Sequence, residues 1–328
     1  MQAFDKLRPN GVGLVSSETM NSLRIAVLLP CYNEEAAIAQ TVAGFRAALP
    51  AADIYVYDNN SSDRTREVAA EAGAIVRSER MQGKGNVVRR MFADVEADIY
   101  VMADGDATYD AAAAPALIAK LLDEQLDMVV GARKSQVEEA YRRGHRLGNR
   151  LFTGLLANLF GRTFSDIFSG YRVFSRRFAK SFPALSRGFE TETEISVHAL
   201  ELVMPVGEIV TAYGARPEGS ESKLSTYRDG WRILKTILHL VRIERPVLFY
   251  GSFAVALAVL AVVLSIPLMI TYAETGLVPR FPTAILATGL MIVAALSFMT
   301  GLILDTVVRG RREVRRLHYL SFPAPGAK

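Results

Sequence analysis

The sequence predicts an α/β domain built on an open, mostly parallel sheet, followed by an amphipathic helix and a hairpin of two transmembrane helices. Three observations support this fold class. Short apolar runs alternate with helix-like segments across residues 23–133. Polar side chains follow most of these runs, and two long segments near the C-terminus are almost free of charge.

Five short segments rich in apolar and β-branched residues are predicted to be strands: residues 23–30, 53–58, 74–78, 98–104 and 127–133. Because nearly every side chain in them is apolar, we expect strands that are buried on both faces, as in a parallel sheet. Helix-like segments separate them at residues 34–49, 64–72, 85–95 and 113–125. This alternation indicates an open α/β sheet, in a domain that we expect to span residues 23–226. Residues 1–22 carry no signal-peptide pattern and are predicted to be an N-terminal extension.

Polar residues follow four of the predicted strands. The first ends in PCYNEE (30–35), the second in DNNSSD (58–63), the fourth in DGDATYD (104–110) and the fifth in GARK (131–134). In open α/β sheets ligands bind beyond the carboxyl ends of the strands. The four ends together therefore predict a polar crevice along one edge of the sheet.

The acidic residues after the fourth strand suggest a metal site. A turn after Asp104 would let Asp104 and Asp106 converge on one ion, and carboxylate oxygens suit Mg²⁺ or Mn²⁺. The alternative is a solvated turn. Asp110 is expected to begin the next helix, where the positive end of the dipole favours it. After the second strand, Asp58 could accept hydrogen bonds from a base or ribose, while Asp63 is expected to cap a helix near Arg64.

The segment QGKGNVV (82–88) is predicted to open a helix. It differs from a P-loop because Lys84 is followed by Gly85 instead of Ser or Thr. Glycines at a helix start still allow an anion to approach the backbone closely. The alternative is a plain turn.

Two long apolar segments predict transmembrane helices within residues 247–308. Val247–Tyr272 is uncharged, and Thr283–Val308 contains only Asp305. Each is long enough to cross about 30 Å of hydrocarbon. Lys and Arg residues flank the outer ends, so the positive-inside rule predicts a multi-pass protein of the inner (cytoplasmic) membrane with the domain and both termini in the cytoplasm. Two buried helices in a soluble core are the alternative.

Basic residues also lie on both sides of the hairpin. Residues 227–246 alternate basic and apolar residues at helical spacing, which predicts a helix lying on the anionic leaflet. An ordinary amphipathic surface helix is the alternative. Residues 309–328 are predicted to be a basic cytoplasmic tail.

The strand-end motifs and GKGN (83–86) follow one another in a fixed order along the chain. Three further motifs come after them: SDIFSGYR (165–172), GFETETEI (188–195) and ARPEGSESKL (215–224). This set resembles family 2 glycosyltransferases of the GT-A fold. It is similar to the polyprenyl-phosphate glycosyltransferases, such as dolichol-phosphate mannose synthase and the bacterial polyisoprenyl-phosphate glucosyltransferases. The resemblance covers residues 23–310, including the C-terminal hairpin.

The resemblance implies inverting transfer of a hexose from a UDP- or GDP-linked sugar to a polyprenyl (undecaprenyl) phosphate, giving a lipid-linked donor for cell-envelope glycan or lipid modification. It implies Mg²⁺ or Mn²⁺ bound by Asp104 and Asp106. The expected donor-binding residues are Pro30, Tyr32, Asn33, Glu34, Asp58, Asn60, Lys84, Gly85, Asp104 and Gly105. The expected acceptor-phosphate residues are Arg133, Arg142, Arg146, Arg216, Ser222 and Lys223, and the expected catalytic residues are Asp104, Asp106, Asp166 and Arg172.

Some roles stay open at this point. Arg142, Arg143 and Arg146 could draw in the acceptor phosphate, or they could be a solvated face or contact anionic lipid. Asp166 could be a base or could orient Arg172, and we favour orientation because a lipid phosphate is already ionised. Of the three glutamates in GFETETEI, the family pattern indicates Glu192 as the one that faces the site. Asn59 replaces a frequent second acid, and Thr108 replaces the Gln of the mannose synthases, so the donor sugar is not named.

Composition excludes several other classes. A single cysteine, Cys31, excludes an internal disulfide framework, and none of the four histidines falls in a strand-end motif. The basic residues do not form a groove interleaved with aromatics, which argues against nucleic-acid binding. A processive polysaccharide synthase should carry a Q-x-x-R-W-type motif and more spans. A membrane-tethered nucleotide-sugar-binding protein without turnover would not need the complete residue set. We also expect a homo-oligomer, such as a tetramer.

Overall fold

The computed structural model describes residues 22–135, 164–184, 191–214, 238 and 241–326 of the chain. These residues fall into two compact units. One contains the N-terminal domain together with the end of the chain from Arg315, and the other spans Thr226–Val314. The two units are described separately below.

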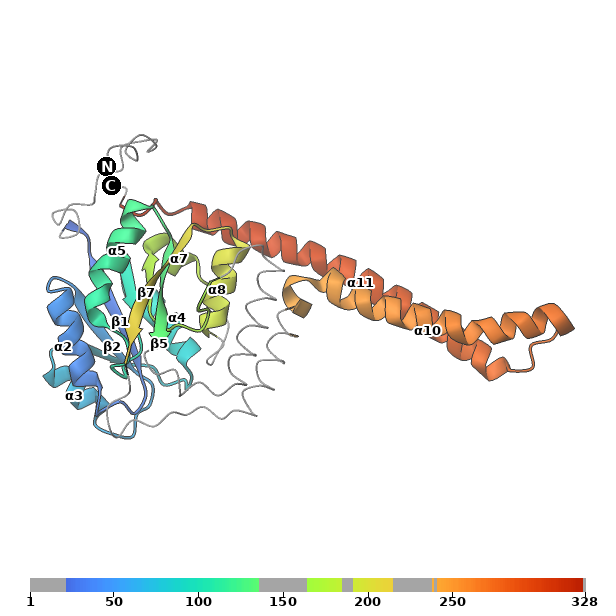
Figure 1. Ribbon diagram of the computed structural model, residues 1–328, viewed down its shortest axis with the longest axis horizontal. Helices are drawn as coiled ribbons and strands as arrows, with labels where there is room; N and C mark the ends of the chain where they lie inside the picture. The colour runs from blue at the N-terminus through green and yellow to red at the C-terminus, as the bar shows by residue number, and fades with distance from the viewer. Residues whose placement is uncertain (1–21, 136–163, 185–190, 215–237, 239–240, 327–328) are drawn as a thin grey trace, which may run out of the picture. The chain divides into compact units, whose positions relative to one another are not determined.

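The first unit is built on a seven-stranded sheet in the order β3-β2-β1-β4-β6-β5-β7 (Figure 1). Its strands are β1 (Ile25–Cys31), β2 (Asp53–Asp58), β3 (Ile75–Ser78), β4 (Ile99–Met102), β5 (Met128–Ser135), β6 (Arg172–Ser175) and β7 (Val206–Tyr213). Neighbouring strands are parallel except where β6 pairs antiparallel with both β4 and β5. The mostly parallel sheet predicted from the sequence is confirmed, whereas β6 and β7 were not predicted.

Helices cover both faces of this sheet. The predicted helices correspond to α2 (Ile38–Ala48), α3 (Thr65–Glu71), α4 (Lys84–Asp94) and α5 (Ala114–Asp123), and two further helices are α7 (Arg176–Ser181) and α8 (Thr191–Glu201). Helix α2 contacts α3 and α5, while α4 contacts α7 and α8. Each group therefore packs on one face of the sheet (Figure 1).

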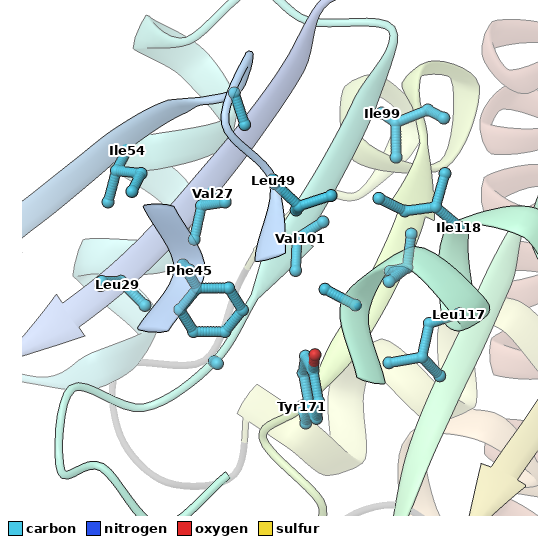
Figure 2. Packing of buried hydrophobic residues seen from close by; sticks show 14 of the residues in the cluster. Val27, Leu29, Phe45, Leu49, Ile54, Ile99, Val101, Leu117, Ile118 and Tyr171 are labelled. Carbon is cyan, nitrogen blue, oxygen red and sulfur yellow. The ribbon is translucent and has the colours of Figure 1, made fainter. Parts of the chain in front are cut away.

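One face of the sheet buries an aliphatic core under α2 and α5. Alternate residues of β1, Val27 and Leu29, point into it with Val101 of β4, and Phe45 and Leu117 reach it from the helices (Figure 2). These side chains are 0–1% exposed, so the strand alternation directs them fully away from water.

The opposite face buries an aromatic core. The ring of Phe92 on α4 makes edge contacts with Tyr100, Phe174 and Phe182, with centroids 5.5–6.0 Å apart. Phe174 in turn stacks on Phe178 at 4.8 Å. Edge-to-face and offset arrangements of this kind add to the stability gained by burial. The short strand β6 is thus held between two differently packed faces.

The end of the chain belongs to the same unit. Arg315 donates to Glu201 at the end of α8 over 2.7 Å, and the hydroxyl of Tyr319 donates to Asp127 over 2.7 Å. The guanidinium of Arg177 lies 4.8 Å from the centroid of the Tyr319 ring. We call residues 315–319 the docking segment. Asp127 is fully buried just before β5, so the docking segment lies at the amino end of that strand.

The second unit contains two long helices, α10 (Pro246–Thr275) and α11, which begins at Phe281 and extends to Leu320. Pro246 begins α10 and Gly276 ends it with φ 68°, the positions where proline and glycine are favoured. Both helices are long and apolar enough to cross a membrane, and their most apolar 18-residue stretches have mean hydropathies of 2.8 and 2.1. Only 17% of each stretch is buried within the protein.

Buried small residues recur along α10 and α11. The buried positions recur every seventh residue, at Ala287, Ala294 and Gly301 on α11 and at Ala254 and Ala261 on α10. A Cβ at Gly301 would lie 3.2 Å from the Cβ of Tyr250. Small residues at a heptad spacing let two apolar helices approach closely, which agrees with the predicted hairpin.

The helices are longer than the apolar segments that predicted them. Helix α11 has 40 residues and continues through the arginines that follow Val308. At 1.5 Å per residue it is about 60 Å long, roughly twice a hydrocarbon layer. Much of the segment predicted as a basic tail is therefore helical. Most of the predicted interfacial helix, residues 227–237 and 239–240, lies outside the described residues.

Candidate active site

The parallel strands bring the predicted polar ends to one edge of the sheet. Asp58 is the last residue of β2, Asp104 follows β4, and Arg133 lies near the end of β5. Strands β1, β2 and β4 pair in parallel, and β5 has the same direction because β6 is antiparallel to both β4 and β5. These three residues therefore lie at the same edge, opposite the end where the docking segment lies.

The loops after β1 and β2 are joined by hydrogen bonds. The backbone amide of Asn33 donates to the Ser61 hydroxyl over 2.9 Å, and its side-chain oxygen accepts from the Ser62 amide over 2.8 Å. The amide of Glu34 donates to the Thr65 hydroxyl over 2.9 Å. Asn33 has φ 53°, a left-handed conformation that asparagine tolerates well. The PCYNEE and DNNSSD motifs thus form one connected surface.

Asn59 ties the second loop to the start of α4. Its amide nitrogen donates to the carbonyls of Glu79 and Met81 over 2.9 Å, and its oxygen accepts from the amide of Gly83 over 2.7 Å. An aspartate could accept from Gly83 but could not donate to the two carbonyls. The amide that departs from the family pattern therefore has a structural role in positioning the loop before Lys84.

The predicted nucleotide residues differ in how far they are exposed. Asp58 is 1% exposed, accepts from the Ser61 amide over 3.3 Å and lies 3.6 Å from the Arg66 guanidinium. Tyr32 is 38% exposed. Asn60 has φ 62° and donates to the carbonyl of Arg80 over 2.7 Å. Asp63 accepts from the Thr65 amide and hydroxyl just before α3, although the N-cap of that helix is Arg64 and not Asp63.

Lys84 joins the proposed metal residue to a glutamate from a distant helix. Its ammonium lies 2.5 Å from Oδ1 of Asp104 and 2.5 Å from Oε1 of Glu192. The side chains of Lys84 and Glu192 are only 12% and 7% exposed. Burial opposes the charge on Lys84, but the two carboxylates outweigh it and raise its pKa. Lys84 is therefore charged at neutral pH within the site.

The loop DGDAT holds its acids in different surroundings. Asp104 keeps 32% of its side chain exposed, whereas Asp106 is 3% exposed and accepts from the Thr108 hydroxyl over 2.6 Å. Thr108 thus fixes the carboxylate two residues before it. Gly105 has no room for a side chain, because a Cβ there would collide with the sulfur of Cys31. Asp110 accepts from the Ala112 amide at the start of the next helical turn, as expected.

Two residues close to Asp104 in space, Gly170 and Tyr109, were not identified as site residues from the sequence. A Cβ at Gly170 would lie 2.7 Å from Oδ2 of Asp104, so the backbone at Gly170 packs directly on this carboxylate. The Gly170 amide donates to the Tyr109 hydroxyl over 2.8 Å. Burial raises the pKa of Tyr109, which therefore keeps its proton at neutral pH. The glycine in SDIFSGYR was a visible signal, but its contact joins segments far apart in the chain.

Asp166 pairs with Arg133 and not with Arg172. Two nitrogens of the Arg133 guanidinium contact the two Asp166 oxygens at 2.7 and 2.9 Å. Burial would raise the pKa of Asp166, but the hydrogen bonds and charge of Arg133 outweigh it and hold that pKa below its usual value. The expected orientation role is therefore directed at a different arginine. An orienting role also agrees better with this geometry than a role as base, because Arg133 engages both oxygens.

Arg172, which was expected to be catalytic, is buried in this structure, and its catalytic role stays a prediction. It is 0% exposed and donates to the carbonyl of Ser169 and the hydroxyl of Ser196, each over 2.9 Å. Burial lowers its pKa to about 10, so it remains charged at neutral pH. In this structure Arg172 is a positioning residue that ties the SDIFSGYR segment to α8.

Several predicted residues lie outside the described residues. They are Arg142, Arg143, Arg146, Glu190, Arg216, Ser222 and Lys223. Of the predicted acceptor-phosphate residues, only Arg133 is described. Its guanidinium also lies 5.4 Å from the centroid of the Tyr213 ring, at the end of β7.

The donor set at Asp104 and Asp106 is compatible with a divalent metal. Within the described ranges, no three His, Cys, Asp or Glu side chains gather as a metal-binding group. Mg²⁺ commonly takes only one or two protein carboxylates and completes its shell with water and substrate phosphates. Asp104, which is partly exposed, could supply such a carboxylate with Asp106 beside it.

Comparison with known proteins identifies related sequences and folds. The model of the family "Glycosyl transferase family 2" matches residues 26–182. The glycosyltransferase AglJ of Haloferax volcanii is 31% identical over 234 residues, which cover 71% of this chain and 77% of AglJ. A dolichyl-phosphate hexose transferase of the same organism is 29% identical over 227 residues, covering 67% of this chain and 95% of that protein.

A solved structure has a similar fold. The glucosyl-3-phosphoglycerate synthase of Mycobacterium tuberculosis, in complex with Mg²⁺ and uridine diphosphate, superposes with a TM-score of 0.56. The sequence identity is 24%, and the match covers 71% of this chain and 84% of the synthase.

Proposed function

Because the chain belongs to glycosyltransferase family 2, we propose that it transfers a hexose, with inversion, from a UDP- or GDP-linked sugar to a polyprenyl phosphate. The observation that carries the proposal is the presence, in one chain, of this domain and two apolar helices with largely exposed side chains. A water-soluble acceptor would not require such helices, whereas a lipid phosphate lies at a membrane surface. The related dolichyl-phosphate hexose transferase supports the same acceptor class.

The donor would bind at the edge of the sheet that holds Asp58 and Asp104. Asp58 and the joined loops after β1 and β2 would hold the nucleoside. Lys84, at the first residue of α4, would attract the diphosphate, which the positive end of a helix also favours. Asp104 and Asp106 would hold Mg²⁺ or Mn²⁺, which when bound would stabilise the charge on the departing diphosphate.

The acceptor phosphate needs positioning more than deprotonation. It is already ionised at neutral pH, so a general base is not required to make it nucleophilic. Arg133, held bidentately by Asp166, would present its guanidinium at a fixed orientation. Arg142, Arg146, Arg216, Ser222 and Lys223 are proposed to complete this phosphate site. Asp166 would act through Arg133.

An activity assay tests this proposal. Purified protein in detergent is mixed with undecaprenyl phosphate and a panel of UDP- and GDP-sugars, with Mn²⁺ or with EDTA. The expected result is metal-dependent release of nucleotide diphosphate and a glycosylated lipid seen by mass spectrometry. D104N should abolish both the release and the lipid product, while the matched variant D94N, at the opposite end of α4 from Lys84, should not. Release of nucleotide diphosphate in the absence of lipid phosphate would refute the proposed acceptor. No release of nucleotide diphosphate with any donor would favour a binding protein without turnover.

The membrane arrangement has its own test. We propose that the catalytic domain and both outer helix ends face the cytoplasm of an inner membrane, because Arg309, Arg311 and Arg312 follow the second apolar segment. The chain has a single, buried cysteine, so new cysteines can be labelled against little background. In intact cells, a membrane-impermeant maleimide should label E274C in the connector and spare R311C. The reverse pattern would refute the orientation.

A further inference from the structure

The ammonium of Lys84 is a positive charge in direct contact with Asp104, the proposed metal ligand. It contacts Oδ1 of Asp104 and Oε1 of Glu192 at 2.5 Å each. A Cβ at Gly170 would lie 2.7 Å from Oδ2 and 3.2 Å from Oδ1 of Asp104, so this glycine lies close to the carboxylate. One oxygen of the proposed metal ligand is thus bound to a positive charge.

The charge on Lys84 opposes a second cation at Asp104. A divalent ion near Asp104 would have to displace the ammonium or lie close to it. Like charges a few ångströms apart repel strongly where solvent is partly excluded.

Glu192 offers Lys84 a second partner. It lies in the first turn of α8, where the helix dipole favours a carboxylate, and it is nearly buried. If Asp104 released the ammonium, Glu192 could retain it without exposing an unpaired charge. The start of α4, where Lys84 lies, also favours an anionic ligand.

We propose that Lys84 and Glu192 form an internal counter-ion pair that competes with the divalent metal for Asp104. Lys84 would keep metal affinity low until a nucleotide diphosphate supplies negative charge, and Glu192 would hold the displaced ammonium. Metal and nucleotide would then bind in a mutually dependent way. This inference rests on the proposed function for the metal site, and it adds positioning roles for two residues whose contact joins α4 to α8.

Manganese binding in the absence of turnover tests the pair. Free Mn²⁺ is measured by electron paramagnetic resonance with the full-length protein in detergent, first alone and then with UDP or GDP. K84M should bind Mn²⁺ alone about tenfold more tightly than the wild type, because a charge within a few ångströms is removed and solvent screens part of the effect. K84R, which keeps the charge, should retain the weak binding. E192Q should bind Mn²⁺ less tightly than the wild type in the presence of nucleotide.

The opposite signs separate this mechanism from a folding defect. Damage to the fold would weaken Mn²⁺ binding in every variant, and thermal unfolding would report it. If K84M folds but binds Mn²⁺ alone no more tightly than the wild type, the competition is refuted. If K84M does not fold, unchanged Mn²⁺ affinity in E192Q with nucleotide refutes it. If nucleotide fails to promote Mn²⁺ binding even in the wild type, and the transfer assay is also negative, the proposed function itself fails.

Discussion

Adding one methyl group at Gly170 should impair catalysis without unfolding the domain. The variant is G170A, which places a Cβ against the carboxylate of Asp104. The backbone of Gly170 is not in the left-handed region that favours glycine, so alanine can adopt its conformation. The effect should therefore arise from contact with Asp104 and not from backbone strain.

The size of the effect follows from the contact distances. The new Cβ would lie 2.7 Å from Oδ2, 3.1 Å from Cγ and 3.2 Å from Oδ1 of Asp104. Ordinary contact begins near 3.4 Å, so Oδ2 must retreat by about 0.7 Å, while Lys84 holds Oδ1. Displacements near 1 Å at a catalytic group cost about 100-fold in rate. We expect kcat/KM to fall 10- to 100-fold, or about 1.4–2.7 kcal/mol.

The assay measures kcat/KM for nucleotide diphosphate release together with thermal unfolding. G44A on α2 is the matched control, because its Cβ would lie 3.3 Å from Ala111, away from the carboxylate. We expect G44A to keep its activity. Wild-type kcat/KM in G170A would refute the role of this close packing, and equal losses in both variants would point to a general effect of added methyl groups.

Three further predictions concern stability. N59D should lower the unfolding free energy by about 1–3 kcal/mol in urea denaturation, because two carbonyls lose their donor. Y319F should lower it by about 0.5–1.5 kcal/mol, because Asp127 loses a hydrogen bond. Asp166 has a lowered pKa when folded, so its contribution is complete above the unfolded value near 3.9 and is lost as the pH falls through the folded value. D166N should therefore keep its fold and show a smaller drop in melting temperature between pH 5 and pH 3 than the wild type.

Each of these has a clear contrary result. An N59D protein as stable as the wild type would mean that water replaces the lost donors. Y272F removes a hydroxyl from the exposed face of α10, and a loss equal to that of Y319F would show that the Asp127 contact contributes nothing specific. An acid-unfolding profile of D166N identical to that of the wild type would remove Asp166 from the pH response.

The local patterns of the sequence predicted the parallel part of the sheet well. Strands β1 to β5 are short apolar runs with clear turn residues, and their buried faces leave little ambiguity. Strand β7 was missed because its alternating sequence VGEIVTAY is partly exposed. Strand β6, with four residues, is too short to stand out by periodicity, and its antiparallel insertion between β4 and β5 is set by tertiary pairing.

Residues of the candidate site could be predicted where they belong to one short sequence motif. Asp104 and Asp106 follow directly from a strand-end argument. The pairing of Lys84 with Glu192 did not, because these two residues are more than a hundred positions apart and no local pattern relates them. The same reason explains Asp166, which lies near Arg172 in sequence but pairs with Arg133, 33 residues earlier. Charge alone indicates that a carboxylate needs a partner, but packing selects which one.

The docking segment also sets an order for folding during translation. Asp127 and Tyr319 are separated by 192 residues, and both apolar helices are synthesised between them. A ribosome therefore delivers the whole sheet before it delivers Arg315 and Tyr319. Contacts of such long range form late, because the intervening chain must first be made and ordered. The catalytic domain would emerge with Glu201 and Asp127 still lacking these two partners, and it would complete its packing only after the helical hairpin has left the ribosome.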